Sequence, residues 1–344
     1  MTIRVLIVDD SEVVRKAFEN GLNKDPEIEV VGTASDPFIA RNKIIELKPD
    51  VVTLDIEMPR MDGISFLGKL MKYYPIPVVI VSTLSSNNSP AALAAIDAGA
   101  VEVMSKPTAT FKLEEVLTLL RDKVKSASKA NMSKMQLFQN VPIYKPSIAS
   151  KINHQYNKIL LIGASTGGTQ AIENIIKQLP ALCPATVIVQ HMPAGFTAAF
   201  SERLNGLYEM EVKEACDGDE IFPGRVLVAP GHSHVIIKAQ GSKFITHLST
   251  GPLVNRHRPS VEVLFNSGAS VLKDKAVGVM LTGMGADGAQ GMLKMKTAGA
   301  HTIAQDEASC VVFGMPKAAI ECGAVKAILP LDKIAAASVT ACKK

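Results

Sequence analysis

The chain has 344 residues, 47% of them hydrophobic, which is enough for about two domains that each bury a core. The formal net charge is +4, and the five cysteines include no C-x-x-C pair and no histidine at zinc-finger spacing, which argues against a disulfide framework and a structural zinc site. The amino terminus is too short and too acidic for a signal peptide, and no run of about 18 apolar residues occurs, so we expect a cytoplasmic protein without membrane insertion.

The first third of the chain alternates short apolar runs with amphipathic segments. The runs cover residues 5–8, 28–31, 51–54, 78–81 and 101–104. The segment after the first run places Val14, Phe18 and Leu22 on one face and Arg15 and Glu19 on the other, as in a surface helix. Because such alternation demands parallel strands with right-handed crossovers, the sequence predicts a flavodoxin-like (βα)5 domain over residues 1–122.

Strand signals then disappear, and residues 123–156 are predicted to form a flexible basic linker. Residues 121–158 hold eight basic side chains and one acidic side chain, whereas residues 1–120 hold 12 basic and 17 acidic ones. The positive charge therefore belongs to the linker. No basic nucleic-acid-binding face is needed to explain it, and we expect no nucleic-acid partner because the second half shows no helix-turn-helix pattern.

The βα alternation resumes after the linker. Apolar runs at residues 159–162, 186–189, 226–228 and 277–281 predict strands, and helices are predicted to open near Gly168 and Gly288. We therefore expect a second, doubly wound and mostly parallel α/β domain over residues 157–344, so the whole chain belongs to the α/β class.

Polar residues of the first domain follow four of its predicted strands. Asp9 and Asp10 come after the first, Asp55 after the third, Ser82 after the fourth and Lys106 after the fifth. In a parallel sheet these positions share one edge, where three carboxylates would repel unless a hard cation such as Mg²⁺ lay between them. The alternative interpretation of the aspartates is helix N-capping, which would not bring all these residues together.

Residues 1–120 resemble a response-regulator receiver domain. The resemblance is carried by the acidic pair at 9–10 and by Leu-Asp-Ile-Glu-Met-Pro-Arg-Met-Asp-Gly at residues 54–63. It implies that a sensor histidine kinase supplies a phosphoryl group to Asp55. Receivers often carry an aromatic residue three positions before the conserved lysine, and this chain has Val103 there. The resemblance further assigns Asp9, Asp10, Asp55 and the backbone carbonyl of Glu57 to Mg²⁺, Ser82 to the switch hydroxyl and Lys106 to the phosphate contact.

A second set of polar residues lies in the C-terminal half. The strand at 159–162 runs into Gly-Ala-Ser-Thr-Gly-Gly at residues 163–168, a G-x-S-x-G pattern at a strand-to-helix turn, where Ser165 can serve as a nucleophile near a helix N-terminus. The alternative is a phosphate-binding loop, but the spacing is not G-x-G-x-x-G and no G-K-[ST] follows.

A serine nucleophile needs a base and an orienting carboxylate. His191 ends the next predicted strand and should lie beside Ser165, while His232 and His234 are reserve candidates. Asp287 follows the strand at 277–281 and suits the carboxylate, the alternative again being a helix N-cap.

The second domain resembles the catalytic domain of the CheB family of chemotaxis protein-glutamate methylesterases and glutamine deamidases. Further shared segments are Gln-His-Met-Pro at 190–193, Asn-Arg-His-Arg-Pro-Ser at 255–260 and Ala-Ser-Cys-Val-Val-Phe-Gly-Met-Pro at 308–316. The resemblance implies a cofactor-free hydrolase with Ser165, His191 and Asp287 as its catalytic triad. It also implies that the backbone near Thr166 and Met284 helps to bind the oxyanion.

The resemblance implies glutamyl methyl esters and certain glutamines on the cytoplasmic helices of chemoreceptors as substrates. It also implies that the unphosphorylated receiver restrains the catalytic domain. Arg256 and Arg258 are candidates for docking an acidic receptor surface, and a purely structural role is the alternative. Two further hypotheses are the same chemistry on receptors of a non-motility chemosensory pathway and a non-enzymatic, phosphorylation-dependent scaffold.

Overall fold

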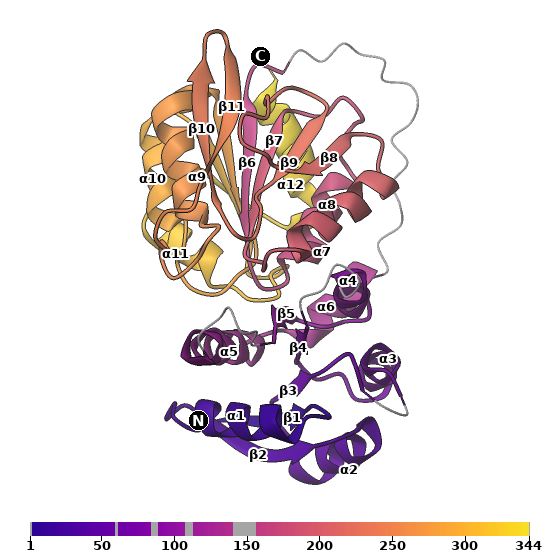
Figure 1. Ribbon diagram of the computed structural model, residues 1–344. Coiled ribbons are helices and arrows are strands. Elements are labelled where there is room, and N and C mark those ends of the chain that lie inside the picture. The colour runs from indigo at the N-terminus through magenta and orange to yellow at the C-terminus, as the bar shows by residue number, and fades with distance from the viewer. Residues whose placement is uncertain (1, 59–60, 84–88, 107–112, 140–155, 344) are drawn as a thin grey trace. The chain divides into compact units, whose positions relative to one another are not determined.

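The computed structural model describes residues 2–58, 61–83, 89–106, 113–139 and 156–343 (Figure 1). The chain forms two compact units, Met1–Gln136 and Leu137–Lys344. Every helix within the described ranges is too short or too polar to serve as a membrane span.

The first unit contains a five-stranded parallel sheet in the order β2-β1-β3-β4-β5, with α1 and α5 packed together on one face (Figure 1). This architecture confirms the predicted (βα)5 fold. The strands are β1 (Ile3–Val8), β2 (Ile28–Ala34), β3 (Val51–Leu54), β4 (Val78–Ser82) and β5 (Glu102–Ser105). The helices are α1 (Glu12–Leu22), α2 (Pro37–Leu47), α3 (Gly63–Tyr73), α4 (Ser89–Asp97) and α5 (Leu113–Ala127). A further helix, α6 (Met132–Gln139), follows α5.

The first turns of two helices in the first unit show whether the aspartates at the strand ends act as helix caps. Helix α1 is capped by Ser11 and α3 by Asp62, and each side chain accepts a hydrogen bond from a backbone amide of the first turn. Asp9, Asp10 and Asp55 are therefore not the N-caps of these helices. Capping does not account for the acidic residues at this edge of the sheet.

Part of the predicted linker is helical. Helix α5 continues to Ala127 and α6 covers residues 132–139, so the prediction of a flexible tether over 123–156 is wrong for these stretches. Residues 140–155 lie outside the described ranges. The sequence did not show the apolar periodicity of this part of α5 because one of its buried positions is occupied by a charged residue, Lys123. The Lys123 Nζ lies 2.6 Å from Glu102 Oε2.

The second unit contains a seven-stranded sheet in the order β14-β13-β12-β6-β7-β9-β8, in which every neighbouring pair is parallel. Its strands are β6 (Ile159–Ala164), β7 (Thr186–Gln190), β8 (Glu211–Glu214), β9 (Arg225–Val228), β12 (Ala276–Met280), β13 (His301–Gln305) and β14 (Ala327–Leu329). An antiparallel hairpin is formed by β10 (His234–Gln240) and β11 (Lys243–Ser249).

Helices cover both faces of this sheet, which is why β6, β7 and β12 are buried along their whole length. Helices α9 and α10 pack together on one face, and α7 and α12 pack together on the other (Figure 1). The helices are α7 (Gly168–Ile176), α8 (Phe196–Leu207), α9 (Val261–Ser267), α10 (Ala289–Thr297), α11 (Met315–Glu321) and α12 (Leu331–Cys342). A π-helical turn (Gly268–Leu272) and a 3₁₀ turn (Lys273–Lys275) follow α9.

The strand order places a topological switch point in each unit. In the first sheet the chain leaves β1 toward β2 and later continues on its other side with β3. In the second sheet β7 lies on one side of β6 and β12 on the other. The crevice at such a point, outside the carboxyl ends of the strands, is where open α/β sheets bind ligands. The candidate residues of both units fall at these two crevices.

Candidate functional site

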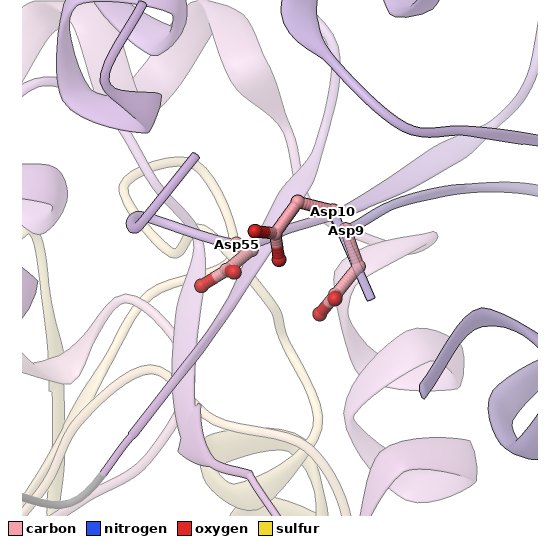
Figure 2. Close-up of side chains that lie close together, drawn as sticks. All are labelled: Asp9, Asp10 and Asp55. Carbon is pink, nitrogen blue, oxygen red and sulfur yellow. The ribbon is translucent and has the colours of Figure 1, made fainter. Parts of the chain in front are cut away.

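Three aspartates meet at the switch point of the first unit (Figure 2). Asp9 and Asp10 follow β1 and Asp55 follows β3, and one carboxylate oxygen from each lies within 4.8 Å of the others. Asp9 and Asp55 are buried and Asp10 is exposed. Three carboxylate oxygens with one open side suit a hard divalent cation that keeps part of its water shell, so the donor set fits Mg²⁺.

Lys106 ties two of these carboxylates together. Its Nζ lies 2.7 Å from Asp9 Oδ2 and 2.7 Å from Asp55 Oδ2. Burial raises the pKa of Asp55 to about 6, and Lys106 only partly offsets this effect. Burial also opposes the charge on Lys106, but its hydrogen bonds to the two carboxylates leave its pKa above the ordinary value. The first unit therefore holds a desolvated carboxylate beside a fixed cation.

The remaining candidates of the first unit are Ser82, Glu57 and Val103. Ser82 ends β4, is fully buried, and its Oγ has no hydrogen-bond partner among the residues that the structure describes. The Glu57 amide donates to Asp55 Oδ1 at 3.2 Å, and the predicted metal contact of the Glu57 carbonyl stays a prediction. A side chain at Gly63 would collide with the Asp55 carbonyl oxygen, which explains the glycine. Val103 is part of the core of the sheet.

In the second unit, strand register places Ser165 beside His191. Ala164 on β6 pairs with Gln190 on β7, so the next residue of each strand lies at the same edge. The Gln190 amide Nε2 also donates to the Ser165 carbonyl at 2.9 Å, which fixes the turn after β6. Gly167 caps α7 with a φ of 73°, a conformation that favours glycine. Ser165 thus lies just ahead of a helix N-terminus, as predicted from the glycine spacing.

The His191 ring is held on two sides. Its Nε2 lies 2.9 Å from Asp287 Oδ2, and the ring stacks on His257 with centroids 3.7 Å apart and an interplanar angle of 12°. Its Nδ1 is buried and has no hydrogen-bond partner in the described part of the chain, so it is not bonded to Ser165 Oγ in this structure. Strand register therefore brings the three predicted residues to the same edge of the sheet, and the contact between His191 and Asp287 is already made.

Asp287 accepts hydrogen bonds from four donors besides His191. Oδ1 accepts from Asn255 Nδ2 (2.8 Å), Ser260 Oγ (2.7 Å) and the Glu262 amide (3.3 Å), and Oδ2 accepts from the Val261 amide (2.7 Å). Burial alone would raise the pKa of Asp287. The hydrogen bond and charge of His191, together with the hydrogen bonds from Asn255 and Ser260, instead hold the pKa well below its usual range. The carboxylate therefore also satisfies the N-terminus of α9, the helix that begins at Val261.

Two residues predicted to border the oxyanion lie near this crevice. Thr166 is buried, and its carbonyl accepts a hydrogen bond from Thr282 Oγ1 at 2.9 Å. Met284 is half-buried and precedes Gly285, whose φ is 83°. Their contact with an oxyanion stays a prediction.

The two candidate docking arginines differ in their surroundings. Arg256 is exposed at the tip of a turn. Arg258 is half-buried, and its guanidinium donates to the Thr250 and Gly251 carbonyls at 2.9 Å each, which fits the alternative structural role. Docking by either arginine stays a prediction.

The ring of the reserve histidine His234 bonds to backbone groups and not to Asp287. His234 Nδ1 accepts from the Ser260 amide at 3.2 Å, and its Nε2 lies 3.0 Å from the Pro252 carbonyl. His234 thereby braces the loop that carries Ser260. His232 is exposed.

Sequence reasoning did not assign roles to four side chains that contact the candidate site. These are Gln190, Asn255, His257 and Ser260. The available signal was their place in the motif segments 190–193 and 255–260, which are polar but predict no regular element.

The fold and the two crevices define a response regulator whose second unit has the layout of an α/β serine hydrolase. A family model for the response regulator receiver domain matches residues 5–118, and one for CheB methylesterase matches residues 160–338. The chain belongs to the CheB methylesterase family.

Relatives extend this match over nearly the whole chain. The protein-glutamate methylesterase/protein-glutamine glutaminase 2 of Syntrophus aciditrophicus is 50% identical over 336 residues, which cover 97% of each chain. The corresponding protein of Syntrophotalea carbinolica is 52% identical over 337 residues, covering 97% of this chain and 96% of its own. Among solved structures, the Thermotoga maritima CheB methylesterase catalytic domain is 43% identical with a TM-score of 0.52, covering 54% of this chain and 99% of its own.

Proposed function

We propose that this protein is a phosphorylation-activated serine hydrolase that demethylates glutamyl methyl esters and deamidates specific glutamines on chemoreceptors, providing sensory adaptation in chemotaxis. The observation that carries the proposal is the meeting of Ser165, His191 and Asp287 at one switch point, with His191 Nε2 bonded to Asp287. The relatives are named for both activities. An ester and a primary amide pass through similar tetrahedral intermediates and differ mainly in the leaving group.

The histidine geometry assigns the proton path. Because Asp287 holds Nε2, the nitrogen left to act as base is the buried Nδ1. In the proposed reaction Nδ1 takes the Ser165 hydroxyl proton while Oγ bonds to the acyl carbon. The imidazolium, stabilised by Asp287, then protonates the leaving group, which departs as methanol or ammonia. Water cleaves the acyl-enzyme with the same base, releasing the glutamate carboxylate and restoring Ser165.

The negative charge that develops on the acyl oxygen needs donors at the same crevice. Helix α7 begins at Gly168, three positions after Ser165, and presents the positive end of its dipole there. We place the oxyanion between this helix start and the backbone around Met284 and Thr166, where preorganised amides stabilise charge at no reorganisation cost.

The receiver supplies control in this proposal. A sensor histidine kinase passes a phosphoryl group to Asp55, and Asp9, Asp10, Asp55 and the Glu57 carbonyl hold Mg²⁺, which neutralises charge on the phosphoryl oxygens when bound. Lys106, already beside Asp55, is placed to contact a phosphoryl oxygen.

In this proposal Ser82 makes the second contact with the phosphoryl group. Its buried hydroxyl has no hydrogen-bond partner among the described residues and is available to donate to the new group. Phosphorylation then favours a receiver state that leaves the catalytic crevice open, which requires a shift of only a few kcal/mol. None of the five cysteines, all of which lie in the described part of the chain, forms a disulfide, which fits a reducing compartment, and we place the protein in the cytoplasm with the receptor helices.

The proposal is tested by methanol and ammonia release from methylated or glutamine-containing chemoreceptor. Purified full-length protein, Mg²⁺ and a small phosphodonor should release both products. Ser165→Ala should release neither, and Asp55→Asn should retain only the unstimulated rate. Equal release by wild type and Ser165→Ala would refute the hydrolase assignment.

A further inference from the structure

An exposed turn closes over the His191–Asp287 pair. Val254 and His257 are joined by backbone hydrogen bonds in both directions, at 3.1 and 2.9 Å. The two residues between them, Asn255 and Arg256, have φ values of 51° and 68° and are exposed. This is the geometry of a tight two-residue hairpin turn with both central residues in the left-handed region.

The turn contacts both the acid and the base of the candidate triad. The Asn255 amide Nδ2 donates to Asp287 Oδ1 at 2.8 Å, and the His257 ring stacks on His191. The other non-histidine donors to Asp287 come from three consecutive residues, 260–262, at the start of α9. Asn255 is thus the donor that reaches the carboxylate from a separate segment.

We propose that Asn255 is a positioning residue for the hydrolysis, an inference that rests on the proposed function. Together with the donors at residues 260–262, its amide holds the Asp287 carboxylate against rotation about the Cβ–Cγ bond, so that Oδ2 stays directed at His191 Nε2. A carboxylate held at one oxygen by a separate segment cannot turn without breaking a charge-assisted hydrogen bond. Asn255 therefore acts through Asp287 and not by touching substrate.

The backbone of Asn255 offers a way to test its side chain separately from the turn. At a φ of 51° glycine is the residue of lowest strain, and asparagine is tolerated there. Asparagine is also a favoured residue in such turns, so a variant that keeps the turn and removes the amide is needed to isolate its contact with Asp287. Replacing Asn255 by glycine should accordingly ease the turn while removing the donor, which separates a role in the turn from a role in the reaction.

The test compares Asn255→Gly with Lys273→Gly in the full-length protein. Lys273 has a φ of 56°, is exposed and lies at the junction after the π-helical turn, so its replacement relieves the same strain away from the crevice. Three readouts are needed: kcat and KM for methanol release, the rate at which a fluorophosphonate probe labels Ser165, and the thermal unfolding midpoint.

The inference predicts a fall in kcat of about tenfold to a hundredfold for Asn255→Gly with KM unchanged, while the protein stays folded because the lost hydrogen bond and the relieved turn strain act on the unfolding midpoint in opposite directions. Probe labelling of Ser165 should slow by a similar factor, because it needs the activated serine but no receptor docking. Asn255→Asp keeps the shape but opposes two carboxylates, so it should be slower still. Lys273→Gly should match the wild type in kcat, KM and probe labelling, and its unfolding midpoint reports the effect of relieving the strain alone.

Several results would overturn the inference. These are a kcat of Asn255→Gly within twofold of wild type, and a rise in KM alone, which would mark Asn255 as a substrate contact. If Asn255→Gly does not fold, the near-isosteric Asn255→Asp decides, and wild-type labelling of Ser165 in that variant would overturn the inference. Failure of the proposed function is seen separately, as activity that survives Ser165→Ala.

Discussion

Replacing Asp287 by asparagine removes a charge that five donors share. Oδ1 accepts from Asn255, Ser260 and the Glu262 amide, and Oδ2 accepts from His191 and the Val261 amide. An asparagine amide has one acceptor oxygen and one NH₂ group. Whichever way the new side chain turns, its NH₂ group faces at least two N–H or O–H donors.

The loss of folding stability in Asp287→Asn can be worked out from these contacts. Hydrogen bonds to a charged group contribute about 1.5–3 kcal/mol each, and breaking a buried ion pair costs about 3–5 kcal/mol. For Asp287→Asn we expect a loss of about 3–5 kcal/mol in the free energy of unfolding of the catalytic unit. At about 2–4 °C per kcal/mol for a unit of this size, its midpoint should fall by about 6–20 °C. Because His191 loses its acceptor, kcat should fall by about 10³–10⁴-fold.

The stability difference between wild type and Asp287→Asn should depend on pH in a definite direction. The pKa of Asp287 is lowered on folding, so its ionised form stabilises the native state above the unfolded pKa of about 3.9, and this stability is lost as the pH falls through the folded value. The difference between wild type and Asp287→Asn should therefore be full at pH 7 and shrink below about pH 4. Thermal unfolding of the full-length proteins measures it. Equal midpoints at pH 7, or a difference that grows on acidification, would refute the reasoning.

Three further predictions concern the receiver and its control. Lys123→Met removes the cation that lies 2.6 Å from the buried Glu102 carboxylate, and the free energy of unfolding measured in urea should fall by about 3–5 kcal/mol. The double variant with Glu102→Leu should recover most of this loss, and a double variant as unstable as the single one would contradict the prediction. Asp55→Asn, or removal of divalent metal by EDTA, should abolish the phosphodonor-dependent rise in methanol release while sparing the basal rate, and a rise that survives both treatments would exclude Asp55 as the phosphoacceptor. A fragment of residues 157–344 should hydrolyse ester faster than the unphosphorylated full-length protein, and an equal or lower rate would rule out restraint by the receiver.

The central strands of both units were predictable because they are buried on both faces and read as unbroken apolar runs. The predictions at 51–54, 159–162 and 277–281 lie within two residues of the observed strand ends. The hairpin β10–β11, the edge strands β8 and β14 and the interior strand β13 were not predicted, because each of these strands is short or contains polar or partly exposed residues. Helix α5 was cut short because Lys123 and Ser126 are buried on it.

The candidate site likewise contains residues that the sequence pattern could place and residues that it could not. Ser165, His191 and Asp287 follow buried strands, so strand ends alone placed them in one crevice. Asn255 and His257 come from a turn with no strand or helix signal, and their contacts with Asp287 and His191 depend on how that turn folds back. A sequence pattern marks such residues as polar but carries no information on which carboxylate they meet.

The central claim, that Ser165 is the nucleophile for both activities, is tested most directly by titrating it. Full-length protein is labelled to increasing extents with a fluorophosphonate probe, the modified residue is mapped by mass spectrometry, and methanol and ammonia release are measured at each extent. The account predicts modification at Ser165 and a proportional loss of both activities, reaching zero at one label per chain. Either activity persisting in fully labelled protein, or inactivation with the label on another residue, would contradict it.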